Sequence, residues 1–397
     1  MPLRSKQRLV LAKTEGSSYG VNSSPTGSNA LFINDDLELS QPAGGGTTQR
    51  RIIRPYRGAY ETLIVNSQVS ITFSVELAGS GTAGTAPAYA DLLRSCAMAQ
   101  TISSSALTGT AQAGSAGSIT LAASGTSAVD GFYVGQLVSL TGGTGSGSAG
   151  VITAYNGSSK VATVQKTTAA FTPDATSQYS IGSNVSFRPI STVDGVADTS
   201  CTIVYNVDGV QHILLGCRGT ASLNCALGEI PSLSFTMTGI YTTPTDTAQS
   251  TYTLAYANQA TPAVFKSDVV SGFNFFGVST CLQSVQLDVG NEVQYRELIG
   301  CGKRVDIIDG QTTGTVMMEA TTMAIWNPFD ASLTDSSTGL LSLVHGATAG
   351  NRVGLVVPRV DLGQPTYSRD QGTEMINVPI NAIPSAVGND DFYLVFS

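Results

Sequence analysis

The side chains best suited to catalysis are two histidines that stand alone in the sequence. His212 alternates with apolar residues in a predicted hairpin strand, and His345 is expected at the end of a helix, before Gly346. A hydrolase needs a nucleophile held by an oriented base. No Gly-x-Ser-x-Gly, Walker or EF-hand spacing occurs in the chain. The sequence therefore predicts no enzyme activity.

The other reactive side chains are six cysteines: Cys96, Cys201, Cys217, Cys225, Cys281 and Cys301. Their spacings contain no Cys-x-x-Cys pair, so a zinc site is not expected. Cys201 and Cys217 flank an Asp208-Gly209 turn. A two-residue hairpin turn there pairs Cys201 with Gly216 and places Cys217 on the opposite face of the ribbon. We therefore expect six reduced thiols, which is typical of a protein made in a cytoplasm.

Two kinds of segment resemble ligand sites but lack the rest of the motif. Gly142–Gly150 is rich in glycine, but no Lys-Ser/Thr pair and no helix follow it, which favours a hairpin loop over a phosphate-binding loop. The pairs Asp35-Asp36 and Asp390-Asp391 could bind a cation, although adjacent acids are common in solvated turns. We expect neither a metal nor a cofactor.

Composition narrows the class of protein. The 397 residues carry 20 basic and 28 acidic side chains, and only 12% of the chain is charged. This is not the composition of a disordered chain, no apolar run is long enough to span a membrane, and no basic stripe predicts a nucleic-acid reader. Residues 1–70 hold eight bases and five acids on an otherwise acidic chain. A basic arm on an acidic body suggests that copies of one chain dock on each other; a solvated basic tail is the alternative.

The first half of the chain has one clear strand–helix unit. Residues 69–77 alternate strictly between apolar and polar, as a half-buried strand does. A short helix is predicted over 86–97, with Thr85 as N-cap and Pro87 in its first turn. Its apolar stripe, at helical spacing, consists of Tyr89, Leu92, Leu93 and Cys96.

The composition changes over residues 104–186, where Ser, Thr, Gly and Ala dominate and short β patterns recur. This segment is predicted to be a small independent β-barrel inserted between the helix and its next strand, because insertions at surface loops cost little entropy. A β-meander with a strong Asp208-Gly209 hairpin signal follows.

The second half of the chain repeats the order of these features. Val285–Asp288 resembles Asp36–Leu39, and Met318-Glu319-Ala320 resembles Val75-Glu76-Leu77. Leu340 and Leu341 are expected on a second short helix that corresponds to the first. We therefore predict a mainly β fold with two β-sandwich or barrel domains, each with one flanking helix. The first tube domain is predicted to comprise residues 1–103 and 187–245, with a long loop at 41–67. The inserted surface β domain is 104–186, and the second tube domain is 246–397.

Three segments carry a resemblance to a known family. They are Ala90–Cys96 after an alternating strand, Cys217-Arg218-Gly219-Thr220 after the Asp-Gly hairpin, and Gly228-Glu229-Ile230-Pro231 before another alternating strand. In these features the chain resembles the major tail tube proteins of long-tailed, siphovirus-type bacteriophages, best over residues 1–103 and 187–245. The resemblance implies a structural virion protein whose domains form six-membered rings that stack into a tube for DNA ejection. With two tube domains in each chain, a ring would be a trimer with pseudo-sixfold symmetry; a hexamer is the alternative.

The resemblance also assigns roles to charged residues. The long loop corresponds to the family's inter-ring loop, so Arg50, Arg51, Arg54 and Arg57 are expected to dock on acids of the adjacent ring. Acids that line the tube would repel DNA phosphates and let double-stranded DNA pass without binding. The candidates for this lining or its rims are Asp208, Asp288, Glu292, Asp306 and Asp309. Implied partners are further copies of the chain and the tape measure, tail terminator and distal tail proteins, but no membrane.

Two other interpretations remain open at this stage. A capsid decoration or head-completion protein would share the β-rich composition, and a carbohydrate-binding adhesive module is suggested by the Ser/Thr-rich insertion. The adhesive module would need clustered aromatics, and those of the insertion are scattered. The expected location is the virion tail, after assembly in the host bacterial cytoplasm.

Overall fold

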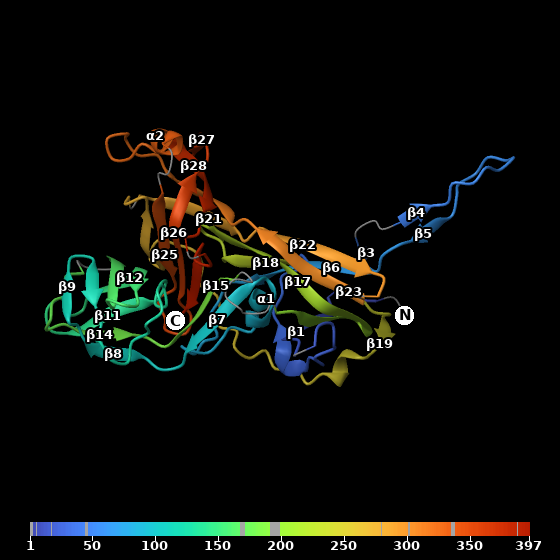
Figure 1. Ribbon diagram of the computed structural model, residues 1–397, viewed down its shortest axis with the longest axis horizontal. Helices are drawn as coiled ribbons and strands as arrows, with labels where there is room; N and C mark the ends of the chain where they lie inside the picture. Colours follow the sequence, from blue (N-terminus) through green and yellow to red (C-terminus); the bar gives the residue numbers. More distant parts are fainter. Residues whose placement is uncertain are drawn as a thin grey trace.

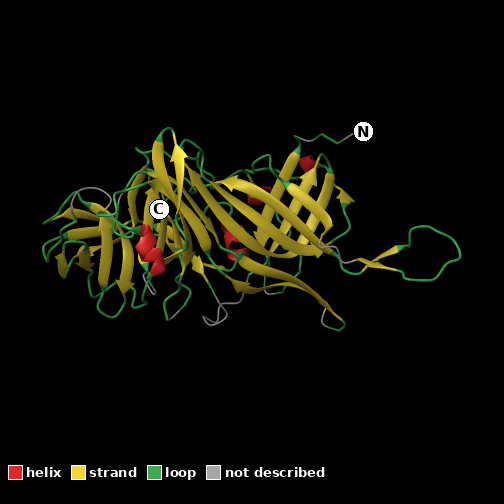
Figure 2. Cartoon of the chain, turned by 90° about the horizontal axis from the view of Figure 1, so that it is seen from above, coloured by secondary structure: helices red, strands yellow, loops and turns green. Residues whose placement is uncertain are grey.

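The computed structural model describes residues 3–4, 6–16, 18–43, 47–166, 171–190, 199–278, 280–300, 302–334, 338–386 and 388–397. Within these residues the protein is mainly β, with two short α-helices (Figures 1 and 2). Eighteen of the described strands join in one hydrogen-bonded network, and seven form a separate sheet. The prediction of a mainly β fold is confirmed.

Six strands of the larger network form what we call module 1. Their pairing order is β1 (Arg8–Thr14), β16 (Cys201–Val207), β17 (Val210–Ala226), β18 (Ser232–Tyr241), β6 (Gln68–Glu76) and β3 (Glu38–Ala43). The strict alternation of β6 buries Val69, Ile71 and Phe73 on one face, as a half-buried strand requires. Asp208 and Gly209 connect β16 to β17 with positive φ angles of 46° and 98°, as a two-residue hairpin turn does.

Six strands from the second half of the chain, module 2, repeat this pairing order. They are β20 (Val270–Phe275), β25 (Gly339–His345), β26 (Val353–Leu362), β28 (Thr373–Ala382), β24 (Thr313–Glu319) and β21 (Leu282–Asp288). A register shift between β16 and β17 recurs between β25 and β26. Matching strand to strand places Val360 where module 1 has Cys217, and Glu319 where it has Glu76.

The first helix is shorter than predicted. Helix α1 (Ala90–Ser95) begins after Tyr89, so Thr85 is not its N-cap, and Pro87 lies in the preceding turn, where its carbonyl accepts the Ala90 N–H. Leu92, Leu93 and Cys96 are fully buried, and the Tyr89 hydroxyl donates to the Ala78 carbonyl at 2.6 Å. The helix therefore packs into the core of module 1 through the predicted stripe, which consists of Tyr89, Leu92, Leu93 and Cys96.

The prediction that Leu340 and Leu341 lie on a second helix is wrong. Both residues lie on β25, which pairs with β20 on one edge and β26 on the other. Helix α2 (Pro328–Leu333) comes earlier, where the Asn327 side chain caps the N–H groups of Phe329 and Asp330. An Asn N-cap followed by Pro is a helix start signal. The apolar run at 339–345 is a strand because both of its edges find partners in the folded chain.

The strands of the insertion form the separate sheet. Its strand order is β8 (Leu107–Thr110), β14 (Gln178–Ile181), β11 (Leu137–Gly142), β12 (Ala149–Asn156), β13 (Val161–Lys166), β10 (Ser118–Thr120) and β9 (Ala113–Ser115). Its apolar core continues into module 2 through Val344, Val356 and Val395. Strand β15 (Asn184–Pro189) pairs with β7 (Met98–Ser103) and with β29 (Tyr393–Phe396), so both ends of the insertion are anchored at that junction.

The register prediction for Cys201 is also wrong. The β-bulge in β17, where Gly216 has a φ of +60°, inserts an extra residue, and Cys201 lies opposite Cys217. Both are buried free thiols, as are Cys96 and Cys225. Burial raises the pKa of Cys225 to about 12, which makes that thiol unreactive.

Two β-hairpins leave corresponding places in the modules. Hairpin 1, β4 (Thr47–Gln49) with β5 (Thr62–Ile64), connects β3 to β6, and hairpin 2, β22 (Asn291–Leu298) with β23 (Gly302–Gly310), connects β21 to β24. Hairpin 1 projects away from the body, whereas hairpin 2 lies across β17 and β18 (Figure 1). Among the described residues, the remaining elements are β2 (Ala30–Leu31), β19 (Thr245–Asp246), β27 (Thr366–Asp370) and two 3-10 helices, Gly27–Asn29 and Gln249–Thr251.

Candidate assembly surfaces

The two histidines have structural surroundings. The Nδ1 atom of His212 and the Gln41 side-chain oxygen are 2.8 Å apart, and His345 Nε2 hydrogen-bonds the Ala263 carbonyl at 3.1 Å. Burial lowers the pKa of both imidazoles, which favours the neutral form. Among the residues that the structure describes, no three His, Cys, Asp or Glu side chains gather as a metal site would need. In the same residues no helix is long and apolar enough to span a membrane.

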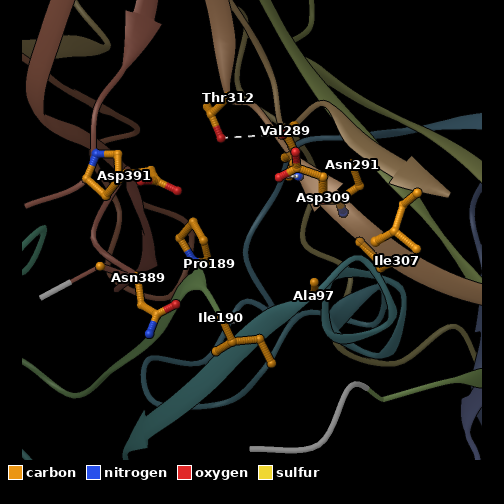
Figure 3. A pocket seen from close by; sticks show the side chains of 14 residues that line it. Ala97, Pro189, Ile190, Val289, Asn291, Ile307, Asp309, Thr312, Asn389 and Asp391 are labelled. Carbon is orange, nitrogen blue, oxygen red and sulfur yellow. Dashed lines mark hydrogen bonds between the residues drawn. The ribbon is translucent and has the colours of Figure 1, made fainter. Parts of the chain in front are cut away.

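A cavity of about 340 Å³ lies between the end of α1, the end of β15 and the base of hairpin 2 (Figure 3). Ala97, Pro189 and Ile307 contribute to its walls, together with the acids Asp309 and Asp391. Among the described residues that line the cavity, none is Lys, Arg, His or Cys. These lining residues come from both halves of the chain, so the cavity lies at the boundary of the two modules.

Asp391 at this cavity makes stability depend on pH. Burial, and then the neighbouring charge of Asp390, raise its pKa from 3.8 to about 6. The folded state therefore holds this proton more tightly than the unfolded state, and stability is lost as pH rises from about 4 to above 6. Asp391→Asn removes this buried charge, and we expect it to stabilise the chain at pH 7.5. The expected gain is only about 1 kcal/mol, because solvent screens a part-exposed group. Near pH 4 the substitution is expected to be neutral. Thermal unfolding at both pH values measures the change in stability, with substitution of the exposed Asp246 by Asn as the control. An equal effect of Asp391→Asn at both pH values would contradict the prediction.

The two modules are joined by a strand pair inside the chain. The last residues of β17 pair antiparallel with β21, with Leu223 opposite Leu287 and Cys225 opposite Val285. All four side chains are buried, so the sheet and the core both continue from module 1 into module 2. This junction satisfies the backbone of one edge of each module.

The opposite edges of the two modules remain open. In the described part of the chain, β3 pairs only with β6, and β27 pairs only with β28. Tyr367 on β27 is 53% exposed although it packs on Phe329, and Leu39 on β3 is half-buried. Unpaired edges with apolar side chains are sites for pairing with another chain. The sequence alone does not locate these edges, because strand order is a tertiary property.

Hairpin 2 docks on module 1 through charged and polar contacts. Arg218 donates to the Val305 carbonyl at 2.8 Å and forms an ion pair with Asp306 at 3.3 Å, where the side chains are 12% and 21% exposed. The guanidinium stacks over the Tyr19 ring at 5.1 Å, and the Tyr19 hydroxyl accepts the Val305 N–H. Lys303 reaches the Ser67 hydroxyl. Asp306 is therefore a docking residue that is largely removed from solvent.

Hairpin 1 has no such contact with the described parts of the chain outside its flanking strands. Arg50, Arg51 and Arg57 are exposed; Arg50 pairs with Glu61 at 3.2 Å within the hairpin. Arg54 lies over the Tyr60 ring at 4.7 Å. Ile53 is fully exposed. Exposed apolar and cationic side chains on a projecting hairpin indicate a surface that is covered by another molecule.

The face of the modules opposite the core is polar, and it holds few of the predicted acids. Asp288 lies on this face at the end of β21. Asp208 is in the β16–β17 turn, where its carboxylate accepts the Arg4 N–H; Glu292 is exposed on hairpin 2, and Asp309 lines the cavity. The structure therefore does not bring the five predicted acids together.

Three acids that the sequence analysis missed lie on the same polar face as Asp288: Glu38, Glu76 and Glu319. Their neighbours are Ser, Thr, Asn and Gln; for example, Thr72 donates to Thr236, and Gln286 donates to Asn224. The alternation in β6 and β24 could have found Glu76 and Glu319, because each follows an apolar residue that faces the core.

A comparison with protein families gives one match. A family model described as "Phage tail tube protein" matches residues 5–382, which is nearly the whole chain. A comparison with curated proteins returns no match.

Proposed function

Because the chain belongs to the phage tail tube protein family, we propose that modules 1 and 2 are two tube domains and that three chains close one ring of the tail tube. In this proposal the first tube domain contains module 1 and comprises residues 1–103 and 187–245. The second contains module 2 and comprises residues 246–397, and the insertion 104–186 decorates the outer surface. The protein is a structural component of the tail, and the proposal concerns how its copies assemble.

The observation that carries the proposal is the β17–β21 junction. It pairs the last part of β17 in module 1 with β21, the strand at one edge of module 2, inside one chain. In module 2, β27 pairs with β28 as the last part of β17 pairs with β18 in module 1. In module 1, β3 pairs with β6 as β21 pairs with β24 in module 2. A second copy can therefore repeat the junction by pairing its β3 with β27 of the first copy. A contact of this head-to-tail kind closes into a ring when the rotation permits.

The intrachain junction also supplies a register for the contact between chains. Leu223 corresponds to Tyr367, and Leu287 corresponds to Leu39. In the proposed ring Tyr367 lies opposite Leu39 of the next copy, and both apolar side chains become buried. Repetition of this contact pairs the open edges of β3 and β27 in every copy, which favours a closed ring over a single chain.

The number of copies follows from the number of modules. A ring of six tube domains, as the family resemblance implies, needs three chains with two modules each. A hexamer of this chain would contain twelve modules, so we favour the trimer with pseudo-sixfold symmetry.

We propose that the polar face lines the lumen. Glu76 and Glu319 occupy corresponding positions in the two modules, so a trimer presents them as one ring of six carboxylates. Glu38 and Asp288 add further negative charge on the same face. Carboxylates repel phosphates, which lets double-stranded DNA pass without specific binding.

In the tube the rings stack, and the arginines of hairpin 1 contact acids on another copy of the chain. Further partners of the finished tube are the tape measure, tail terminator and distal tail proteins. Assembly in the host bacterial cytoplasm is consistent with the four buried free thiols.

Electron microscopy and mass measurement of the purified protein test the proposal. Hollow rods whose dissociated rings have the mass of three chains are the expected result. Rings of another copy number would overturn the trimer, and a protein that remains monomeric at high concentration would overturn ring formation by the free edges.

A further inference from the structure

The docking of hairpin 2 on module 1 is a contact between one tube module and the hairpin of the next. Its centre is Arg218 on β17, whose guanidinium binds the Val305 carbonyl and the Asp306 carboxylate of β23. The hairpin leaves β21 immediately after the strand pairing with β17 and continues over the neighbouring module. Hairpin placement and strand junction are therefore parts of one interface.

The strand registers identify the position in module 2 that corresponds to Arg218. In module 1, Arg218 follows Cys217 and lies opposite Thr238 of β18. In module 2 the residue after Val360 is Asp361, which lies opposite Asn381 of β28. Val360 and Leu362 on either side of Asp361 are buried, so its side chain is on the opposite face from the core, as that of Arg218 is.

The charge of this position is reversed between the modules, and the charge of the hairpin is reversed with it. Arg218 receives hairpin 2, in which residues 291–310 carry four acids and three bases. Asp361, with the opposite charge, occupies the corresponding position in module 2. Residues 49–64 of hairpin 1 carry four arginines and one acid, Glu61.

Resting on the ring described under Proposed function, we infer that hairpin 1 of each copy docks across module 2 of the neighbouring copy in the same ring, with its arginines on Asp361. In the described part of the chain no hairpin covers Asp361, and its carboxylate is half-buried without a basic partner. The occupant is a second copy of this chain. Within one chain, the pairing of β21 with β17 places hairpin 2 over β17; in the same way, pairing of β3 with β27 of a neighbouring copy would place hairpin 1 over the neighbour's β26.

This placement differs from the one that the family resemblance implies. There the four arginines contact acids of the adjacent ring, and removing the contact would leave single rings intact but unstacked. Docking on Asp361 instead makes the arginines part of ring closure. The two placements therefore predict different products from the same variants.

Charge reversal and its rescue test the inference. The first variant is Asp361→Arg, the second changes Arg50, Arg51, Arg54 and Arg57 to Glu, and the third combines both sets. Like charges at an interface oppose association. We expect each of the first two variants to need at least about tenfold more protein for half of the chains to form rings. The combined variant restores the wild-type concentration, and Asp246→Arg, on exposed β19, serves as the control.

The possible outcomes separate this inference from the proposed ring. Wild-type protein that forms no rings overturns the proposed function itself. Wild-type rings with unchanged ring formation in both single-sided variants overturn only the docking on Asp361. Rings that form normally in the variants but no longer stack assign the arginines to the adjacent ring. A loss of ring formation that the combined variant does not rescue also counts against the pairing, provided that thermal unfolding shows each monomer to be folded.

Discussion

Tyr367→Lys is expected to leave the chain folded but to prevent ring closure. Tyr367 lies on the open edge of β27, where the proposed contact sets it opposite Leu39 of the next copy. A lysine there places an unpaired ammonium group in a strand junction that otherwise buries apolar side chains. Natural proteins use lysine on edge strands to block this kind of pairing.

The effect of this substitution is large because every interface in the ring is the same. An unpaired charge in a buried contact costs about 2–5 kcal/mol per interface, and a closed trimer contains the contact three times. We expect no rings at protein concentrations where the wild type assembles completely. Sedimentation velocity and electron microscopy of the same samples measure the outcome.

Two control variants separate the edge contact from folding. Tyr367→Phe keeps the aromatic packing on Phe329, whose ring centre is 5.2 Å away, and is expected to assemble. Tyr256→Lys changes another part-exposed tyrosine, which stacks on Phe32 away from the free edges. Normal rings from Tyr367→Lys would show that β27 does not form the junction between copies.

Glu15→Ala is expected to destabilise the chain by about 3 kcal/mol. Glu15 is buried, with 7% of its surface exposed, and it follows β1 at the bulge of β17. Its carboxylate accepts four hydrogen bonds of 2.7–3.1 Å: from Gly20 N, Ser200 Oγ, Thr202 Oγ1 and Gly216 N. Removing the carboxylate leaves buried donors unpaired, and a charged acceptor makes each of these bonds stronger than a neutral one would.

Urea unfolding of Glu15→Ala and Glu15→Gln measures this effect. The glutamine keeps the shape but presents an amide N–H to at least one donor, so we expect it to lose about 1–2 kcal/mol. Glu229→Ala changes an exposed glutamate; it is the control and is expected to be neutral. A loss below 1 kcal/mol for Glu15→Ala would mean that water or neighbouring carbonyls replace the carboxylate.

Local patterns in the sequence were sufficient for several elements. The alternation of residues 69–77 gave β6, the Asp208-Gly209 pair gave the β16–β17 turn, and helical spacing gave α1 and its buried side chains. The family resemblance drawn from these segments is confirmed by the family match over residues 5–382. These elements depend on residues only a few positions apart, so they can be predicted from the order of residues in the sequence.

The errors arose where distant segments decide the outcome. Leu340 and Leu341 have spacing compatible with a helix, but β20 and β26 lie on either side and make the segment a strand. Cys201 faces Cys217 because one bulge, held by Glu15, shifts the register by a residue. A single extra residue reverses the face of every later side chain in a strand, and the local sequence around Cys217 does not specify that bulge.

The sequence by itself determined that this is a β-rich phage tail tube protein, with one buried stripe on its first helix and a long loop rich in arginine. Only the tertiary structure decided which strand edges stay open, which acids share the polar face, and that Arg218 and Asp361 occupy matching positions. The physical reason is that strand order and register bring together residues that lie far apart in the chain. The backbone hydrogen bonds between strands are the same for any alternating segment, so the side-chain pattern of one strand does not specify its partner.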